Sequence, residues 1–483
     1  MIIMKFGGTS VGNAAQIHKV SQIVTAVLSR QPLVVVSALS GVTNHLLSLI
    51  DLAIQKKKVS LAELIQKHKS VIQELKLPDA LLDEEIEEVT ALFRGISLLE
   101  ECSPKTKDRI LAFGERCSCK IVASYLNSVL SKPTLAIFSY DLGLQTTSQF
   151  GQAVPLKESD LTIQTSVSHH KDKLIVTTGF IAKDLERNIT TLGRGGSDYS
   201  ASLMGAALHA EEIQIWTDVN GVYSADPKIV KRAQILSTIS YREASELAWF
   251  GAKVLHPRTI RPAVSKKIPV KVLNTFQPTK PGTLVLEKSH KFRTITAISC
   301  KKNIILVNIY STEMLLSKGF LARIFEIFAK HNISIDLVSA SEVSISVTLD
   351  NEERLQGVAT ELSKFTLVTV AKNLGIVSLV GEGIVTSSKT IKAIFEILDK
   401  KRILVKMVSL GATNVNVSVV VDNAQIEKSV KILHNELLLA GGKNGLKKQP
   451  QLKLNANSYK RKSFSSRFYI QALKQVRNMG AWL

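Results

Sequence analysis

A glycine-rich segment, residues 190–200, is the first part of the chain that suggests chemistry; its sequence is TTLGRGGSDYS. Glycine loses more conformational entropy on folding than any other residue, so three glycines within four positions indicate that another molecule comes close to the backbone. Ser197 and Asp198 stand where a helix start is expected. Backbone N–H groups in such a loop suit an anionic ligand, and Arg194 can make a bidentate contact with a carboxylate or phosphate. The alternative is a glycine hairpin that leads into a capped helix.

Two more loops of small residues follow predicted strands near the start of the chain. An apolar strand at 2–6 leads into GGTS at 7–10, and a strand at 33–36 leads into SALSGVTN at 37–44. A continuous Val/Leu run is typical of a strand that is buried on both faces of a parallel sheet. These strand–loop–helix units predict an α/β fold, in which ligands bind at the carboxyl ends of the strands.

Four cationic side chains stand on strand-end or glycine-flanked loops: Lys5, Arg194, Lys228 and Lys253. Each alone is an ordinary surface charge. Because an α/β sheet brings such loops to one edge, the four together indicate a polyphosphate site.

The helical parts of the first half carry acidic residues. Residues 59–101 and 106–130 are predicted to be helical. The acidic run at 83–88 favours a solvated helix face over paired catalytic carboxylates. In the second helix Glu115 lies off the apolar stripe. Its neighbour Gly114 costs a helix about 1 kcal/mol relative to alanine, which suggests close approach of a ligand.

Composition excludes several classes of protein. A chain of 483 residues predicts about two to four domains, and a hydrophobic content of 45% is globular rather than disordered. Apolar runs fall short of the roughly 18 residues that a membrane helix needs. The first residues read as a strand rather than a signal or transit peptide, and the four cysteines lack metal-ligand or redox spacing. We therefore expect a reduced, cytoplasmic protein.

The formal charge of +21 is unevenly distributed. Residues 443–483 hold ten Lys or Arg and no Asp or Glu, so nearly half of the excess lies in this tail. The tail is predicted to be flexible; the alternative is a short amphipathic helix that docks on the body, a membrane surface or RNA. The body is only moderately basic, which suits an anionic substrate as well as nucleic acid.

A repeat begins near residue 304. The letters IFEI occur at 324–327 and again at 394–397, and each copy is followed by Val-Ser and an alternating strand. Two strand–helix–strand–strand copies predict a tandem α+β module. Neither copy holds a clustered acid–base set, so we expect it to serve in binding or dimer formation.

Four motifs, in this order along the chain, resemble those of the aspartokinases: KFGGTS at 5–10, TLGRGGSD at 191–198, WTDV at 216–219 and FGAKVLHP at 250–257. The resemblance implies the amino-acid kinase fold, an α/β fold with a parallel-rich sheet sandwiched by helices, followed by two α+β, ferredoxin-like ACT domains. The implied limits are 1–290 for the kinase domain, 304–375 and 376–440 for the ACT domains, and 443–483 for the basic tail.

This resemblance implies transfer of the γ-phosphate of ATP, bound with Mg²⁺, to the β-carboxylate of L-aspartate. The product, 4-phospho-L-aspartate, begins the synthesis of lysine, threonine and methionine. An ionised carboxylate needs no general base, so positioning and charge neutralisation suffice. The catalytic residues would be Lys5, Arg194 and Asp198. The ATP-binding residues would be Lys5, Gly7, Gly8, Thr217, Asp218, Tyr223, Lys228 and Lys253, and the substrate-binding residues Thr43, Glu115, Arg194 and Ser197; a dedicated protein metal site is not expected.

Individual roles follow from the same resemblance. Lys5 is expected to steady the transferring phosphoryl group, Arg194 to contact the α-carboxylate of aspartate, and Glu115 and Asp198 to lie near the amino group. The family often has arginine where Lys228 stands, so the charge is kept there and a bidentate contact is lost.

The chain most resembles the monofunctional, lysine-inhibited aspartokinases, because SKGFL at 317–321 and SEVS at 341–344 fit their effector site. Threonine and S-adenosylmethionine stay open as alternative effectors. ACT pairs imply a homodimer or a dimer of dimers, and neither a membrane nor a nucleic-acid partner is expected. The implied lysine pocket consists of Met314, Ser317, Gly319, Phe320, Leu321, Ser334, Ile335, Asp336, Ser341 and Glu342.

Three other functions compete with this one. The first is a kinase of the same fold that acts on another acid, such as glutamate or N-acetylglutamate; the Arg194 loop and the ACT pair argue against it. The second is a non-catalytic amino-acid sensor, against which the intact Lys5, Asp198 and Lys253 speak. The third is an RNA-binding protein led by the tail, whose binding would depend strongly on salt.

Overall fold

The computed structural model describes residues 1–57, 59–250, 255, 257–288, 293–315, 317–411 and 414–439. Lys253 and the basic tail at 443–483 lie outside the described residues. Met1–Leu438 form one compact unit. Among the helices of the described ranges, none is long and apolar enough to cross a membrane.

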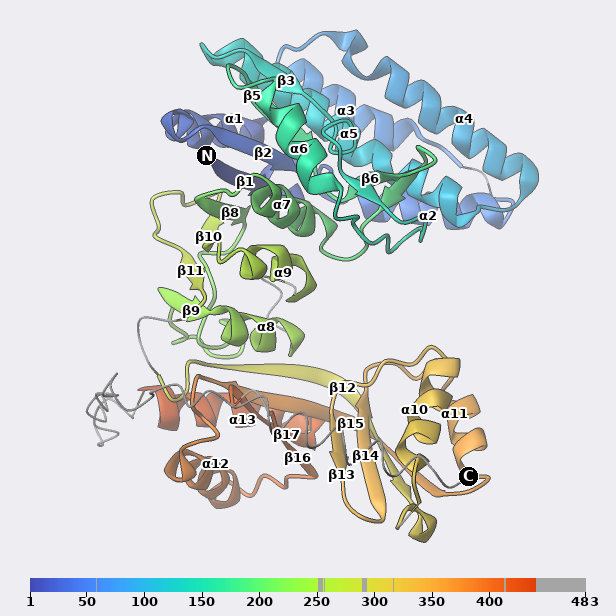
Figure 1. Cartoon of the computed structure of the whole chain (residues 1–483), viewed down its shortest axis with the longest axis vertical. Coiled ribbons are helices and arrows are strands. Elements are labelled where there is room, and N and C mark those ends of the chain that lie inside the picture. The colour runs from blue at the N-terminus through green and yellow to red at the C-terminus, as the bar shows by residue number, and fades with distance from the viewer. Residues whose placement is uncertain are drawn as a thin grey trace, which may run out of the picture. The chain divides into compact units, whose positions relative to one another are not determined.

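An eight-stranded sheet underlies the first part of the chain, with the strand order β3-β5-β2-β1-β8-β10-β11-β9 (Figure 1). Neighbouring strands are parallel except for the antiparallel pair β10–β11. The predicted parallel-rich sheet is therefore confirmed. The strands are β1 (Ile2–Phe6), β2 (Pro32–Val36), β3 (Thr134–Ala136), β5 (Leu174–Thr178), β8 (Glu212–Thr217), β9 (Thr238–Ser240), β10 (Val270–Asn274) and β11 (Thr283–Leu286).

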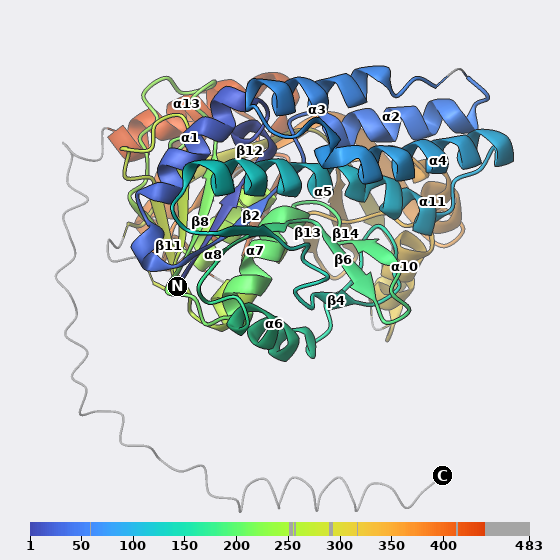
Figure 2. The same ribbon diagram turned by 90° about the horizontal axis from the view of Figure 1, so that it is seen from above.

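Two helical layers cover this sheet because both of its faces are apolar. Side chains of β1 alternate between two hydrophobic clusters, with Ile2, Met4 and Phe6 in one and Ile3 in the other. The first cluster is completed by α1 (Ala14–Thr25), α2 (Val42–Ile54), α3 (Ala62–Glu74), α4 (Asp83–Leu99) and α5 (Pro104–Val129). The second is completed by α6 (Ser159–Ser168), α7 (Gly196–Ala207), α8 (Tyr241–Trp249) and α9 (Pro257–Ser265) (Figure 2).

A small three-stranded sheet lies between β3 and α7 in the sequence. It consists of β4 (Gln145–Thr146), β6 (Ile181–Asp184) and β7 (Ile189–Thr191), in that order. Strand β7 ends at Thr191, two residues before the first glycine of the glycine-rich segment, so this sheet fixes where the glycines begin.

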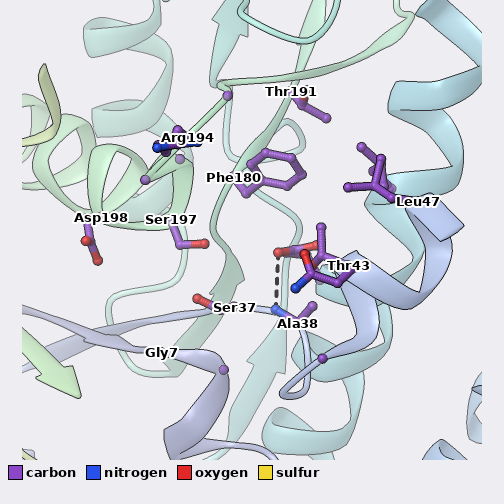
Figure 3. A pocket seen from close by; sticks show the side chains of 18 of the residues that line it. Gly7, Ser37, Ala38, Thr43, Leu47, Phe180, Thr191, Arg194, Ser197 and Asp198 are labelled. Atoms are coloured by element: carbon purple, nitrogen blue, oxygen red, sulfur yellow. Dashed lines mark hydrogen bonds between the residues drawn. The ribbon is translucent and has the colours of Figure 1, made fainter. Parts of the chain in front are cut away.

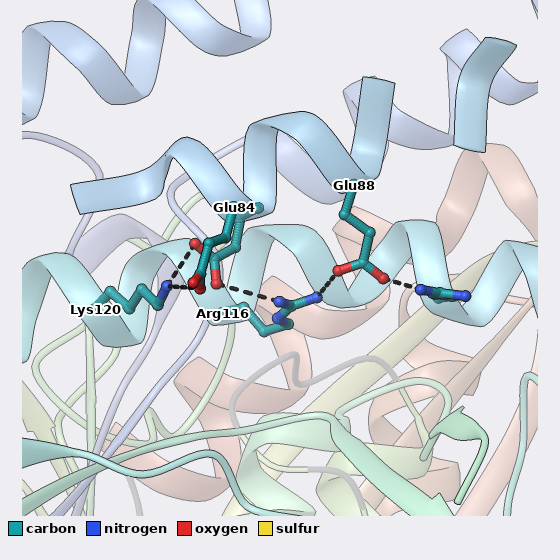
Figure 4. Close-up of polar contacts among 6 residues, drawn as sticks. Glu84, Glu88, Arg116 and Lys120 are labelled. Carbon is teal, nitrogen blue, oxygen red and sulfur yellow. Dashed lines mark hydrogen bonds and ion pairs between the residues drawn. The ribbon is translucent and has the colours of Figure 1, made fainter. Parts of the chain in front are cut away.

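The acidic run on α4 is only in part the solvated helix face that the sequence suggested: Asp83, Glu84 and Glu87 are exposed, whereas Glu85 and Glu88 turn towards α5. Glu85 is only 1% exposed, and its carboxylate contacts Arg116 at 3.2 Å and Lys120 at 2.8 Å. Glu88 pairs with Arg109 and Arg116, and Figure 4 shows Glu84 and Glu88 on α4 facing Lys120 and Arg116 on α5. The prediction was wrong for Glu85 and Glu88, because their cationic partners lie far along the chain.

The repeat beyond residue 304 forms a six-stranded antiparallel sheet with the order β13-β14-β12-β15-β17-β16. The IFEI letters fall on α10 and α12, where Ile324 and Ile394 are fully buried. The predicted α+β repeat is therefore confirmed. The elements are β12 (Ala297–Tyr310), α10 (Phe320–Lys330), β13 (Val338–Ala340), β14 (Ser344–Leu349), α11 (Leu355–Leu362), β15 (Leu367–Val380), α12 (Ser388–Lys400), β16 (Met407–Leu410), β17 (Asn416–Asp422) and α13 (Ile426–His434).

Strands β12 and β15 are each shared between the two copies of the repeat. Residues 297–301 of β12 pair with 376–380 of β15, which in turn pairs with β17. The later part of β12, from Ile305, pairs with β14. Because both copies use the same two strands, the limit drawn between 375 and 376 falls inside β15, and the domain limits stay a prediction.

A loop at 222–236, between β8 and β9, packs against the second copy of the repeat. Ala225, Ile229 and Val230 belong to one hydrophobic cluster with residues of β15 and α12. The Ser224 hydroxyl lies 2.9 Å from Nε2 of His434 on α13. We refer to residues 222–236 as the bridging loop.

Candidate active site

A cleft of about 1200 Å³ opens at the carboxyl ends of β1, β2 and β8. Its walls come from the small-residue loops behind β1 and β2, from α5 and from the start of α7 (Figure 3). Most of the predicted catalytic, ATP-binding and substrate-binding residues line this one cleft. They are Lys5, Gly7, Gly8, Thr43, Glu115, Arg194, Ser197, Asp198, Thr217 and Asp218.

Lys5 is the buried cation of the cleft. It is the last residue but one of β1, and its Nζ lies 2.7 Å from Oδ1 of Asp198 in the first turn of α7. The following loop touches the loop behind β2, since a Cβ at Gly8 would meet the carbonyl oxygen of Ala38 at 2.9 Å. Glycine is therefore required at position 8 for the two strand ends to approach each other.

Arg194 presents an exposed positive charge to the cleft. Its neighbours Gly193 and Gly195 have φ values of +75° and +71°, conformations that favour glycine. The Arg194 side chain is exposed, and it makes no ion pair with any residue of the described ranges. A planar guanidinium in this state can bind a carboxylate through two parallel hydrogen bonds.

Glu115 is the buried acid of the cleft, with 3% of its surface exposed. Its Oε1 accepts a hydrogen bond from the Ala38 N–H at 3.2 Å, and its Oε2 has no partner among the described residues. Burial raises the pKa of this carboxyl to about 8, against the opposing effects of that hydrogen bond and of Lys5. A buried acceptor without a partner suits a cationic group of a ligand.

Gly114, next to Glu115, does not mark the approach of a ligand. A Cβ at this position would lie 2.7 Å from Cβ of Ala38 and 2.9 Å from Cγ1 of Val42. The glycine makes room for the protein's own loop behind β2, so the earlier interpretation was wrong. Its effect is to bring α5, and Glu115 with it, against that loop.

Thr43 and the Thr217-Asp218 pair lie on different sides of the cleft. Thr43 stands in the first turn of α2, and Figure 3 shows it on the same helix as Leu47, across from Arg194, Ser197 and Asp198. Thr217 ends β8, and its hydroxyl lies 3.2 Å from Oδ1 of Asp218. All three residues therefore line the cleft, as the loops at the strand ends predicted. Their roles stay a prediction.

Tyr223 and Lys228 do not line the cleft. Both belong to the bridging loop, where Tyr223 forms an isolated bridge with Ile235 and the Lys228 N–H donates to Asp226 at 2.8 Å. The Lys228 side chain is exposed. Lys253, the remaining predicted ATP-binding residue, lies outside the described residues.

Sequence reasoning missed several residues of the cleft. Ser37 and Ala38 begin the loop that was singled out behind β2, so the signal was present although only Thr43 was chosen from it. Phe180 lines the cleft with a φ of +66°, which is rare for an aromatic residue and has no signature in the sequence. Asp108, 1% exposed, also lines it and accepts hydrogen bonds from Gly151 and Thr191.

The predicted effector residues lie around α10 and the turn before β14. Gly319 precedes α10 with a φ of +82°, which leaves the first N–H groups of that helix open to an anion. Phe320 is buried against Phe365, while Leu321 is exposed. Met314 lies in a short 3₁₀ turn, and Ser317 is exposed before α10.

The acidic residues of that set are in different states. The Asp336 carboxylate lies 2.7 Å from Nζ of Lys301, so it already has a cation. Glu342 is exposed next to Ser341, whose hydroxyl lies 2.7 Å from that of Ser344. Ser334 and Ile335 precede Asp336 in the same connection. Glu342 is therefore the acid of this set that is open to a ligand.

Within the described ranges, no group of three His, Cys, Asp or Glu side chains is placed to hold a metal ion. The cleft does hold the carboxylates of Asp198 and Asp218. Magnesium takes one or two carboxylates and completes its coordination with phosphate oxygens and water, so these residues fit an ion that arrives with a phosphate ligand.

Comparison with known proteins agrees with the fold. Residues 1–274 match the amino acid kinase family, and residues 307–360 and 377–437 match the ACT domain. The chain is 35% identical to Aspartokinase 1, chloroplastic, of Arabidopsis thaliana, over 93% of this chain and 82% of the relative.

Two crystal structures of Escherichia coli aspartokinase III are similar to the whole unit. The complex with aspartate and ADP has a TM-score of 0.78 and 32% identity, over 90% of this chain and 99% of that one. The complex with lysine and aspartate has a TM-score of 0.71 and 32% identity, over 91% and 99%. The chain therefore belongs to the aspartokinases, and it is an aspartate kinase, a phosphotransferase that acts on a carboxyl group.

Proposed function

We propose that this cleft holds ATP and L-aspartate together and transfers the γ-phosphate to the β-carboxylate through Lys5, Arg194, Glu115 and Asp198. The observation that carries the proposal is that one cleft is lined by a buried lysine and, as far as the described residues show, by an arginine without an ion-pair partner and a buried acid with one unpartnered oxygen. The E. coli relative was crystallised with aspartate and ADP, which supports both ligands.

The chemistry needs position and charge rather than a base. The attacking carboxylate is ionised at pH 7, because its ordinary pKa is near 4. Catalysis then consists of holding the acceptor in line with the phosphoryl group and neutralising the charge that spreads over its oxygens. Lys5 supplies that charge, and Asp198, 2.7 Å away, holds the ammonium group in place.

Aspartate is bound by its α-amino-acid end in this proposal. Arg194 takes the α-carboxylate, and Glu115 takes the α-ammonium group, since an ammonium beside Oε2 supplies the missing partner of that oxygen. Thr43 and Ser197 line the space between them. The β-carboxylate is then directed towards Lys5.

ATP is bound by the opposite side of the cleft. Gly7 and Gly8 admit the phosphates to the backbone, and Thr217 and Asp218 contact the nucleotide at the end of β8. Tyr223 and Lys228 complete the set from the bridging loop, and Lys253, which lies outside the described residues, is proposed to contact the ATP phosphates as well. Mg²⁺, held by the phosphates with Asp198 or Asp218 in reach, supplies further charge neutralisation.

A hydroxamate assay for the acyl phosphate tests the reaction. Turnover with L-aspartate and ATP, with little or none for glutamate or N-acetylglutamate, is the expected outcome. An Arg194→Ala variant is expected to raise the KM for aspartate and to leave the KM for ATP within about twofold. Absence of turnover with aspartate would instead favour a non-catalytic amino-acid sensor.

We also propose that lysine inhibits the enzyme from a pocket around α10. The complex of the E. coli relative with lysine supports lysine as effector. The open N-terminus of α10 behind Gly319 suits the α-carboxylate of lysine, and the exposed Glu342 suits its ammonium group. ACT pairs then associate as a homodimer or a dimer of dimers, and a coupling of about 1–3 kcal/mol to the cleft suffices.

Glu342→Ala tests this effector site. We expect unchanged turnover without lysine and a concentration for half-inhibition that rises at least about tenfold, because a charge-assisted contact of roughly 1.5 kcal/mol is lost. Glu313→Ala, at another exposed acid nearby, is the matched control and should leave inhibition unaltered. Equal inhibition of both variants and the parent chain would exclude Glu342 from the site.

The cytoplasmic location expected from the sequence stays a prediction. The Arabidopsis relative carries the word chloroplastic in its name, which describes that protein.

A further inference from the structure

A buried carboxylate outside the proposed contacts joins the two segments next to Arg194. Asp108, in the second turn of α5, accepts three hydrogen bonds. Its Oδ2 accepts from the N–H groups of Gly151 at 2.9 Å and Thr191 at 2.8 Å, and its Oδ1 accepts from the Thr191 hydroxyl at 2.9 Å. One side chain therefore fixes both the loop around Gly151 and the end of β7.

These two segments are pressed together where Asp108 holds them. The Ala153 N–H donates to the Thr191 carbonyl at 2.9 Å. A Cβ at Gly193 would lie 3.0 Å from the carbonyl oxygen of Gly151. The chain that leads into Arg194 thus runs directly over the loop that Asp108 anchors.

Arg194 has no comparable support of its own. It lies between Gly193 and Gly195, which have more backbone freedom than other residues, and its guanidinium is exposed without an ion-pair partner in the described ranges. Its place in the cleft is therefore set by the anchored ends of its loop, α7 on one side and Thr191 on the other.

The helix that carries Asp108 also carries Glu115. The two residues are seven positions apart, which is two turns of α5, so they lie on the same side of the helix, about 10 Å apart along its axis. Both line the cleft. Helix α5 thus holds Glu115 directly and the Arg194 loop through Asp108.

We propose that Asp108 is a positioning residue that fixes the Arg194 loop relative to Glu115 and so sets the affinity for the α-amino-acid end of the substrate. This inference rests on the proposed function, in which Arg194 and Glu115 bind that end. Asp108 itself touches no substrate in this proposal. Misplacement of a binding group by about 1 Å is enough to weaken binding and turnover.

Asp108→Ala and Asp108→Asn, made in the full chain, test the proposal. Alanine removes all three hydrogen bonds, and we expect the KM for aspartate to rise about tenfold or more with the KM for ATP within about twofold. Asparagine can accept both backbone N–H groups with its oxygen and donate to the Thr191 hydroxyl, so it should restore most of the affinity. Asp79→Ala, at an exposed acid outside the cleft, is the control. Equal rises in both KM values, or none, would overturn the proposal.

A double-mutant cycle shows whether Asp108 acts through Arg194. If it does, Asp108→Ala adds less than about twofold to the aspartate KM of Arg194→Ala, whereas independent effects would multiply and contradict the inference. An unaltered aspartate KM in Arg194→Ala alone would refute the proposed function instead. Should Asp108→Ala not fold, Thr191→Val keeps both backbone bonds and should raise the aspartate KM about two- to fivefold; no rise would overturn the inference.

Discussion

Glu115 is present in the cleft in a protonation state that its proposed ligand must change. Burial raises its pKa to about 8, so at pH 7 most of the carboxyl groups are protonated. An ammonium group beside Oε2 favours the ionised form. Binding of aspartate below pH 8 is therefore coupled to the release of a proton from Glu115.

This coupling predicts how the KM for aspartate depends on pH. The KM should fall by up to tenfold per pH unit as the pH rises towards about 8, because less work is then needed to ionise Glu115, and it should level off above. Glu115→Gln should raise the KM and remove the slope. Initial rates at saturating ATP between pH 6.5 and 9 measure this. An equal slope in the variant would mean that another group titrates.

At the scale of elements, α4 and α5 are joined by ion pairs as well as by apolar contacts. Glu85 is buried between Arg116 and Lys120, and it is the most buried acid of the run. Asp108 and Glu115 of the same helix α5 line the cleft. The ion pairs therefore hold one side of this helix while another side lines the site.

Removal of Glu85 tests this bracing. Glu85→Ala should lower the free energy of unfolding by about 2 kcal/mol, because two partly buried cations each lose one of their two carboxylate partners. Glu87→Ala, on the exposed side of the same helix, is the matched control and should change stability by less than about 0.5 kcal/mol. Urea unfolding followed by circular dichroism measures both. Equal stability of the two variants would show that the pairs contribute nothing.

How much of the site was predictable depends on the range of the interactions. The strand-end loops were predictable, since apolar runs and small residues are local signals, and the cleft contains Lys5 and Arg194 from this pattern but not Lys228. The partners of Glu85 and Asp108 were not, because Arg116 stands 31 positions from the former and Thr191 stands 83 positions from the latter. Patterns of neighbouring residues do not predict contacts between residues so far apart in the sequence.

At the scale of the whole unit, the bridging loop belongs to two parts of the molecule at once. It follows β8 and the Thr217-Asp218 pair along the chain. Its residues Ala225, Ile229 and Val230 pack into the second copy of the repeat. Ser224 adds a hydrogen bond to His434, and the Ile298 N–H donates to the Ser224 carbonyl at 2.8 Å. The loop that carries Tyr223 and Lys228, both proposed to contact ATP, therefore packs against the ACT sheet.

Ile229→Ala tests the link. We expect the KM for ATP to rise about threefold or more and the KM for aspartate to stay within about twofold, because the lost packing frees the loop that carries Lys228. Ile345→Ala removes a similar side chain from the core of the first copy and is the control. It should lower stability without affecting the KM for ATP. A rise of equal size in both variants would indicate a general loss of packing.

The bridging loop shares a hydrophobic cluster with the second copy of the repeat, and this limits which changes can remove the proposed inhibition by lysine. Truncation before β12 would leave the apolar side of that loop in water, and Ser224 would lose the contacts that β12 and α13 provide. We therefore expect a shortened chain to bind ATP weakly rather than to act as an autonomous kinase, because this loop carries the proposed ATP contacts Tyr223 and Lys228. Deregulated variants for amino-acid production should therefore carry point substitutions in the effector region on an intact chain.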